Sequence, residues 1–242
     1  MGESFGPWTM GADEDVMPNI TSANVACGAH AGDPGVMRRT VRAAKAHGVS
    51  VGAHPGFADL QGFGRREMQA DPSEVEDSLL AQIGALAAIA RAEGVPLRHV
   101  KAHGALYNMA ARDRTLADAI ARAIKIFDPA LIMFGLPGSP LLDAGVAAGL
   151  RVAAEGFADR SYEPDGSLTP RSRPGAVIDE TARVVDRAVR MVRDGVVLTP
   201  GGKEIPLKVD TVCVHGDTPG AAELTKRIRA GLESAGIQIR AL

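Results

Sequence analysis

The sequence predicts an α/β protein built on parallel strands. Short apolar segments rich in β-branched residues alternate with longer amphipathic segments, and polar residues repeatedly follow the apolar segments. Parallel neighbours need a crossover connection, usually a helix, so this alternation favours a parallel sheet. The pattern leaves two architectures open, a closed barrel and an open sheet.

Six segments have the length and composition of buried strands. In chain order they are Ile20–Cys27, Val49–Ala53, Leu97–Ala102, Ala130–Gly135, Leu150–Ala154 and Thr211–Val214. The segment Val196–Val209 departs from the alternation. It predicts a hairpin that turns about Pro200-Gly201-Gly202, within the same domain.

Helices are expected between the strands. The longest, Pro72–Ala92, carries apolar residues at spacings of three and four, and Asp71 with Glu74 predicts a capping box at its start. The segment Pro34–His47 begins after Asp33 and ends at a glycine, as a capped helix does. Further helices are predicted near Thr115–Ile126, Ser139–Ala148, Glu180–Arg193 and Ala221–Ala235.

Length and composition indicate one domain over residues 1–242 that binds a small molecule. A chain of 242 residues, of which 45% are hydrophobic, can bury a sizeable core. The net charge of -2 offers no basic surface for nucleic acid or for a membrane, and no apolar run approaches the ~20 residues that span a bilayer. Cys27 and Cys213 lie in or beside apolar runs, which favours reduced, buried thiols and a cytoplasmic location.

Polar residues gather at the carboxyl ends of the predicted strands. In a parallel α/β fold these ends lie on one face, where active sites are assembled, so we expect the side chains to share one pocket. They are His30, His54, Lys101, His103, Glu155, His215 and Asp217. Asp33 and Asp217 also suit helix caps, and that alternative stays open for both.

Two loops are rich in arginine, at Gly62–Arg66 and from Asp159 to Arg173. A guanidinium group pairs well with a carboxylate or a phosphate, so Arg65, Arg160 and Arg171 are candidates for holding an acidic substrate or a phosphorylated intermediate. The alternative is a solvated loop held by salt bridges.

Seven segments closely resemble the LamB/YcsF family, in order and over nearly the whole chain. They are Thr21–Asp33, Gly52–Gly56, Gly62–Arg66, Val100–Asn108, Glu155–Arg160, Leu168–Ser172 and Val214–Asp217. The resemblance implies an irregular barrel of seven strands, (β/α)7, TIM-like and related in shape to glycoside hydrolase and carbohydrate deacetylase barrels. Family members begin with a strand ahead of a segment like Gly2–Gly6, so we expect the first strand to be missing from this chain.

The resemblance also implies an activity: ATP-dependent hydrolytic ring opening of 5-oxoproline (pyroglutamate) to L-glutamate, by an A subunit that acts with subunits B and C. ATP, with Mg²⁺, is then a co-substrate. No Walker-type or Gly-x-Gly-x-x-Gly phosphate loop occurs in this sequence, so we expect ATP activation to depend on the partner subunits.

Residue roles follow from this chemistry as expectations. The catalytic candidates are His103, Lys101, Glu155 and Asp217. The substrate-binding candidates are Asn24, His30, His54, Arg65, Asp159, Arg160, Arg171 and His215. A bound metal is left open, with His30, His54 and Asp33 as its candidate ligands. Two other functions are also left open: a metal-dependent amide or sugar deacetylase, and a non-catalytic regulatory subunit that binds a small acid.

Overall fold

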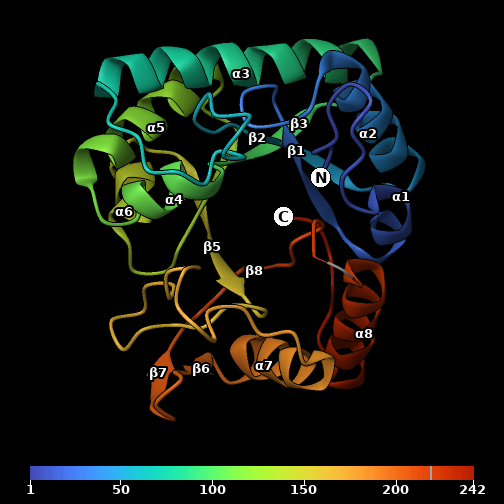
Figure 1. The fold of residues 1–242 in the computed structure, drawn as a ribbon, viewed down its shortest axis with the longest axis vertical. Coiled ribbons are helices and arrows are strands. Elements are labelled where there is room, and N and C mark those ends of the chain that lie inside the picture. Colours follow the sequence, from blue (N-terminus) through green and yellow to red (C-terminus); the bar gives the residue numbers. More distant parts are fainter. Residues whose placement is uncertain (219) are drawn as a thin grey trace.

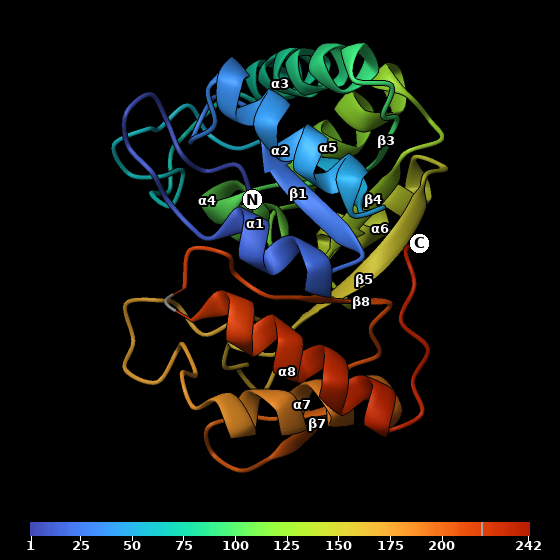
Figure 2. The ribbon, with the colours of Figure 1, turned by 90° about the vertical axis from the view of Figure 1, so that its right-hand side faces the viewer.

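A curled parallel sheet forms the centre of the molecule (Figures 1 and 2). The computed structural model describes residues 1–218 and 220–242. Six strands pair in the order β1-β2-β3-β4-β5-β8, all parallel. They are β1 (Ser22–Ala26), β2 (Ser50–His54), β3 (Leu97–Lys101), β4 (Ile132–Gly135), β5 (Arg151–Phe157) and β8 (Thr211–Cys213). The prediction of a parallel α/β fold is confirmed.

Helices surround the sheet on its outer side (Figure 1). They are α1 (Asp13–Val16), the short 3-10 helix η1 (Met17–Asn19), α2 (Pro34–Ala46), α3 (Pro72–Ala92), α4 (Gly104–Ala110), α5 (Arg114–Phe127), α6 (Pro140–Ala147), α7 (Thr181–Arg193) and α8 (Ala221–Ser234). The predicted hairpin is present as β6 (Val196–Leu198) and β7 (Glu204–Pro206), which pair antiparallel. None of the helices in the described ranges combines the length and apolar character that crossing a bilayer requires.

The sheet is a half-barrel. Within residues 1–218 and 220–242, β8 pairs with β5 and no strand pairing joins β8 to β1. Backbone of Met1 lies instead along the free edge of β1: the Met1 amino group donates to the Asn24 carbonyl at 3.0 Å, and the Ala26 N–H donates to the Met1 carbonyl at 3.1 Å. The opening segment of the chain is thereby placed beside the carboxyl ends of the strands.

Helix α3 begins at the capping residues that the sequence predicts. The Asp71 side chain accepts a hydrogen bond from the Ser73 N–H, and Glu74 completes the predicted capping box of α3. Leu79, Ile83 and Leu86 on the inner face of this helix are fully buried in the main core. Burial of large aliphatic side chains, at about 1.5–3 kcal/mol each, holds the helix against the sheet.

One predicted strand was too short and one helix was not predicted, and both differences affect the site. Strand β5 continues to Phe157, so Glu155 lies inside a strand rather than in the loop after it. Helix α4 was not predicted; it begins directly after His103 and has seven residues, too few for a clear helical period. The short α1 and η1 were missed for the same reason.

Candidate active site

A cavity of about 1230 Å³, lined by both polar and apolar residues, opens inside the curl of the sheet. Ten of the residues singled out in the sequence line it: Asn24, His54, Arg65, Lys101, His103, Glu155, Arg160, Arg171, His215 and Asp217. The carboxyl ends of the parallel strands do bring these dispersed residues together. His30 and Asp159 lie behind this lining as partners of lining residues, and Asp33 is not part of it.

Lys101 and Glu155 form a buried ion pair in the cavity. They come from β3 and β5, and Lys101 Nζ lies 2.6 Å from Glu155 Oε1 and 3.1 Å from the Cys213 sulfur. Burial acts to lower the pKa of Lys101, but Cys213 and Glu155 outweigh it and raise the pKa above its ordinary value. Glu155 Oε2 and the Tyr107 hydroxyl are buried and have no hydrogen-bond partner in the described structure. One oxygen of the Glu155 carboxylate is therefore buried without a partner among the described residues, and Glu155 lines the cavity.

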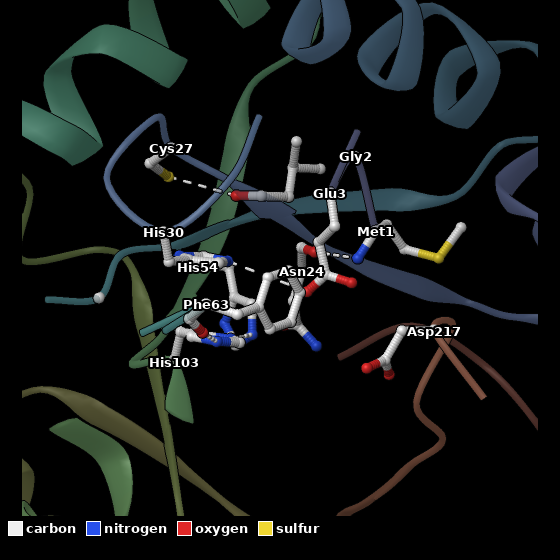
Figure 3. A network of polar contacts seen from close by, with 12 residues as sticks. Met1, Gly2, Glu3, Asn24, Cys27, His30, His54, Phe63, His103 and Asp217 are labelled. Carbon is white, nitrogen blue, oxygen red and sulfur yellow. Dashed lines mark hydrogen bonds and ion pairs between the residues drawn. The ribbon is translucent and has the colours of Figure 1, made fainter. Parts of the chain in front are cut away.

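Three histidines meet near the end of β3 (Figure 3). The ring of His103 stacks flat on that of His30, with centroids 3.7 Å apart, and lies edge-on to that of His54. His54 Nδ1 is 2.7 Å from the Lys101 carbonyl oxygen, and His103 Nε2 is 2.8 Å from the Phe63 carbonyl oxygen. Because a carbonyl only accepts, both of these nitrogens carry hydrogen.

The two remaining nitrogens, His54 Nε2 and His103 Nδ1, face each other at 3.0 Å. Burial lowers the pKa of His54 well below its ordinary value and that of His103 to about 2, with repulsion from neighbouring histidines adding to the effect. Both rings are then neutral at physiological pH. Each facing nitrogen presents a lone pair, which leaves the contact without a hydrogen to share.

Glu3 joins this cluster from the opening segment of the chain. Its Oε1 lies 3.9 Å from His30 Nε2. Burial acts to raise the pKa of Glu3, but the Met1 amino group and His30 outweigh it, so the carboxyl is ionised. Neither ring nitrogen of His30 makes a hydrogen bond in the described structure. We call Glu3, His30, His54 and His103 the histidine cluster.

Two further pairs of polar side chains belong to this site. His215 Nδ1 lies 2.7 Å from Asp159 Oδ2, and Arg65 Nη2 lies 2.7 Å from Asp217 Oδ2. Asp159 is almost fully buried, and although burial acts to raise its pKa, His215 outweighs this and lowers it. Asp159 thus orients His215 from behind. With Lys101–Glu155, we call these three pairs the paired groups.

Arg160 lines the cavity, but loop backbone occupies much of its guanidinium. Its Nε donates to the Ala176 carbonyl at 3.1 Å and its Nη2 to the Thr169 carbonyl at 2.6 Å. Arg171 is exposed on the same loop. Arg160 therefore stabilises the loop, and Arg171 is the freer of the two to meet a substrate anion.

Asp33 is a helix cap, which decides the alternative that the sequence left open. One carboxylate oxygen accepts from the backbone N–H groups of Gly35 and Val36, and the other accepts from the Gly6 N–H. The structure does not group it with the histidines. Glu3, which the sequence reasoning missed, takes that place: its carboxylate and the nitrogens of His54 and His103 all lie within 4.8 Å of one another.

Comparisons with known proteins agree with the fold. The sequence profile described as "LamB/YcsF family" matches residues 1–242. The 5-oxoprolinase A subunit of Symbiobacterium thermophilum is 57% identical over 241 residues, covering 100% of this chain and 92% of its own. Its namesake in Bordetella pertussis is 54% identical over 241 residues, with 100% and 96% covered.

A solved structure gives the same result in three dimensions. The lactam utilization protein from Thermus thermophilus has a TM-score of 0.95 and 50% sequence identity, and covers 100% of this chain and 97% of its own. Similarity at this level over the full length identifies the family, as the sequence motifs indicated. The chain belongs to the LamB/YcsF family.

Proposed function

We propose that this chain is the A component of a 5-oxoprolinase, which opens 5-oxoproline to L-glutamate with ATP as co-substrate and acts together with subunits B and C. The names of relatives at 54% and 57% identity support the substrate and the role as one subunit of several. The observation that carries the proposal for this chain is the buried Lys101–Glu155 pair with its free carboxylate oxygen inside the cavity.

The reaction needs an activated carbonyl, an attacking water and a proton for the departing nitrogen. Amide resonance makes the lactam carbonyl a poor electrophile, and phosphorylation of its oxygen by ATP would turn that oxygen into a leaving group. After ADP has left, water attacks the carbon, and the ring nitrogen gains a proton and leaves as the amine. A second water then hydrolyses the remaining acyl phosphate to the carboxylate of glutamate and inorganic phosphate. A buried carboxylate beside a cation can perform the proton transfers.

Glu155 suits the role of general base better than His103. Both ring nitrogens of His103 already face partners, Phe63 and His54, whereas Glu155 Oε2 has none. Lys101 is placed to balance negative charge that develops on the reacting carbonyl oxygen. Arg65 and Arg171, which line the cavity, would hold the carboxylate of 5-oxoproline.

The proposal is tested by turnover of 5-oxoproline in a mixture of this chain with subunits B and C. Glu155→Gln removes the base and should lower kcat by at least ~100-fold. Lys101→Met removes the cation and should lower kcat by about 10²–10³-fold. Glu93→Gln is the matched control, since Glu93 pairs with Arg42 on the surface and should leave kcat unchanged.

Wild-type turnover in both variants would overturn the residue assignment. If the three wild-type chains bind 5-oxoproline but show no turnover, the chain serves binding alone and the proposed activity fails. We also expect this chain alone to lack ATP hydrolysis, because its sequence carries no phosphate loop.

A further inference from the structure

The contact between His54 and His103 is unstable unless a positive charge lies between the rings. The outward nitrogen of each ring donates to a backbone carbonyl, at 2.7 Å for His54 and 2.8 Å for His103. The inward nitrogens, 3.0 Å apart, then hold lone pairs directed at each other. Either a proton or a metal ion can relieve this repulsion.

A proton would relieve the repulsion between the two nitrogens less well than a metal ion. It would make the two rings an imidazole–imidazolium pair inside a site where both side chains are buried, and burial disfavours the charged form of histidine. A metal ion uses both lone pairs at once and accepts further ligands, so it compensates more of the desolvation cost.

From this geometry we infer that His54 Nε2, His103 Nδ1 and the Glu3 carboxylate form a binding site for one divalent transition-metal ion. Two nitrogens that each lie about 2.1 Å from an ion are about 3 Å apart at right angles, as in octahedral coordination, and about 3.4 Å apart at the tetrahedral angle. The observed separation is 3.0 Å. The three ligand atoms lie within 4.8 Å of one another, so the Glu3 carboxylate would have to move closer to the two nitrogens to complete the set.

The surroundings match those of a metal centre. Ligating histidines donate their second N–H to a carbonyl or carboxylate, which fixes the ring and its tautomer, and both histidines here do so. His30, buried and stacked on His103, lies beside the Glu3 carboxylate and can orient it. Two imidazoles and one carboxylate suit Zn²⁺ and its first-row neighbours and leave coordination positions open toward the cavity.

This inference does not depend on the proposed reaction. If both hold, an ion held here would polarise the lactam carbonyl or activate a bound water, in the same cavity as Lys101 and Glu155. The ligand set also differs from the candidates His30, His54 and Asp33, since Asp33 caps α2 and His30 is stacked on the ring of His103.

The test measures metal binding by the full chain alone. After chelator treatment and dialysis, the protein is titrated with Zn²⁺ and, separately, with Co²⁺, and followed by metal analysis, Co²⁺ absorption and thermal unfolding. We expect about one ion per chain and a rise in Tm with added metal. His54→Gln and His103→Asn should each weaken binding by more than about 100-fold.

Three further variants sharpen the result. Glu3→Gln, which changes a partly buried residue, should also weaken binding and serves if the histidine variants unfold. His215→Asn, on the same cavity but outside the cluster, and His47→Asn, on the surface, should both keep the ion. The inference is wrong if wild-type protein retains less than about 0.1 ion per chain, or if His54→Gln, His103→Asn and Glu3→Gln bind as tightly as wild type. Either failure would leave the 5-oxoproline assay unaffected.

Discussion

The histidine cluster and the paired groups lie at the same cavity, but their buried polar and charged atoms are compensated in different ways. Each side chain of the paired groups has its partner within 2.7 Å, from a distant part of the chain. In the cluster, two neutral rings with inward lone pairs, His54 and His103, lie beside one carboxylate and the ring of His30. The paired groups are thus complete within the folded chain, whereas the cluster is complete only with a cation from outside.

The largest effect is expected from breaking the most buried pair. Lys101→Met would leave the Glu155 carboxylate charged and unpaired, which should lower the free energy of unfolding by about 3–5 kcal/mol in urea titrations. Adding Glu155→Gln to that variant removes the uncompensated charge and should recover most of the loss. If the double variant instead loses the sum of both single effects, the two side chains do not act as a pair.

The convergence of the site was predictable, because it follows from chain direction. His54 and Lys101 are the last residues of β2 and β3, and parallel strands place such residues at one edge of the sheet. Their apolar runs are visible in the sequence. The choice of Asp33 between cap and ligand was not predictable, since Asp suits both and only the N–H groups around it decide.

Partners that meet through irregular segments could not be predicted. Glu3 precedes every periodic segment, and it reaches the histidines because Met1 pairs with the edge of β1. Asp159 and His215 are 56 residues apart, and no pattern links a loop carboxylate to one histidine among six. Arg160 suggested anion binding, but buried loop carbonyls needed its donors.

A glycine substitution tests how tightly the histidine cluster is packed. Gly64 has φ +61°, and a Cβ there would lie 2.9 Å from His103 Cδ2 and 2.9 Å from His30 Cβ. Gly64→Ala should therefore cost about 2–4 kcal/mol, from backbone strain and overpacking together. Gly138→Ala is the control: φ is +67°, but no atom lies within 4 Å of the new Cβ, so only strain of about 1 kcal/mol remains.

Chemical denaturation measures the loss in free energy of unfolding of each glycine variant. The difference between the two losses is the cost of overpacking at Gly64. Equal losses would show that the rings yield to a new methyl group, which contradicts a rigid cluster. A Gly64→Ala loss that shrinks on addition of Zn²⁺ would show that the ion restores the ring positions.

The smallest effect concerns the pH dependence of the Asp159–His215 pair. Because the folded pKa of Asp159 is lowered, its contribution to stability is fully present above the unfolded value of 3.8 and is lost as the pH falls through the folded value. Asp159→Asn should lower the free energy of unfolding by about 1 kcal/mol at neutral pH. The variant should also lose less stability than wild type as the pH falls into the acid range, which we call the acid limb. Urea titrations from pH 7 down to the acid limb measure both quantities. An acid limb as steep in the variant as in wild type would mean that other carboxylates set it, and that His215 is positioned without help from Asp159.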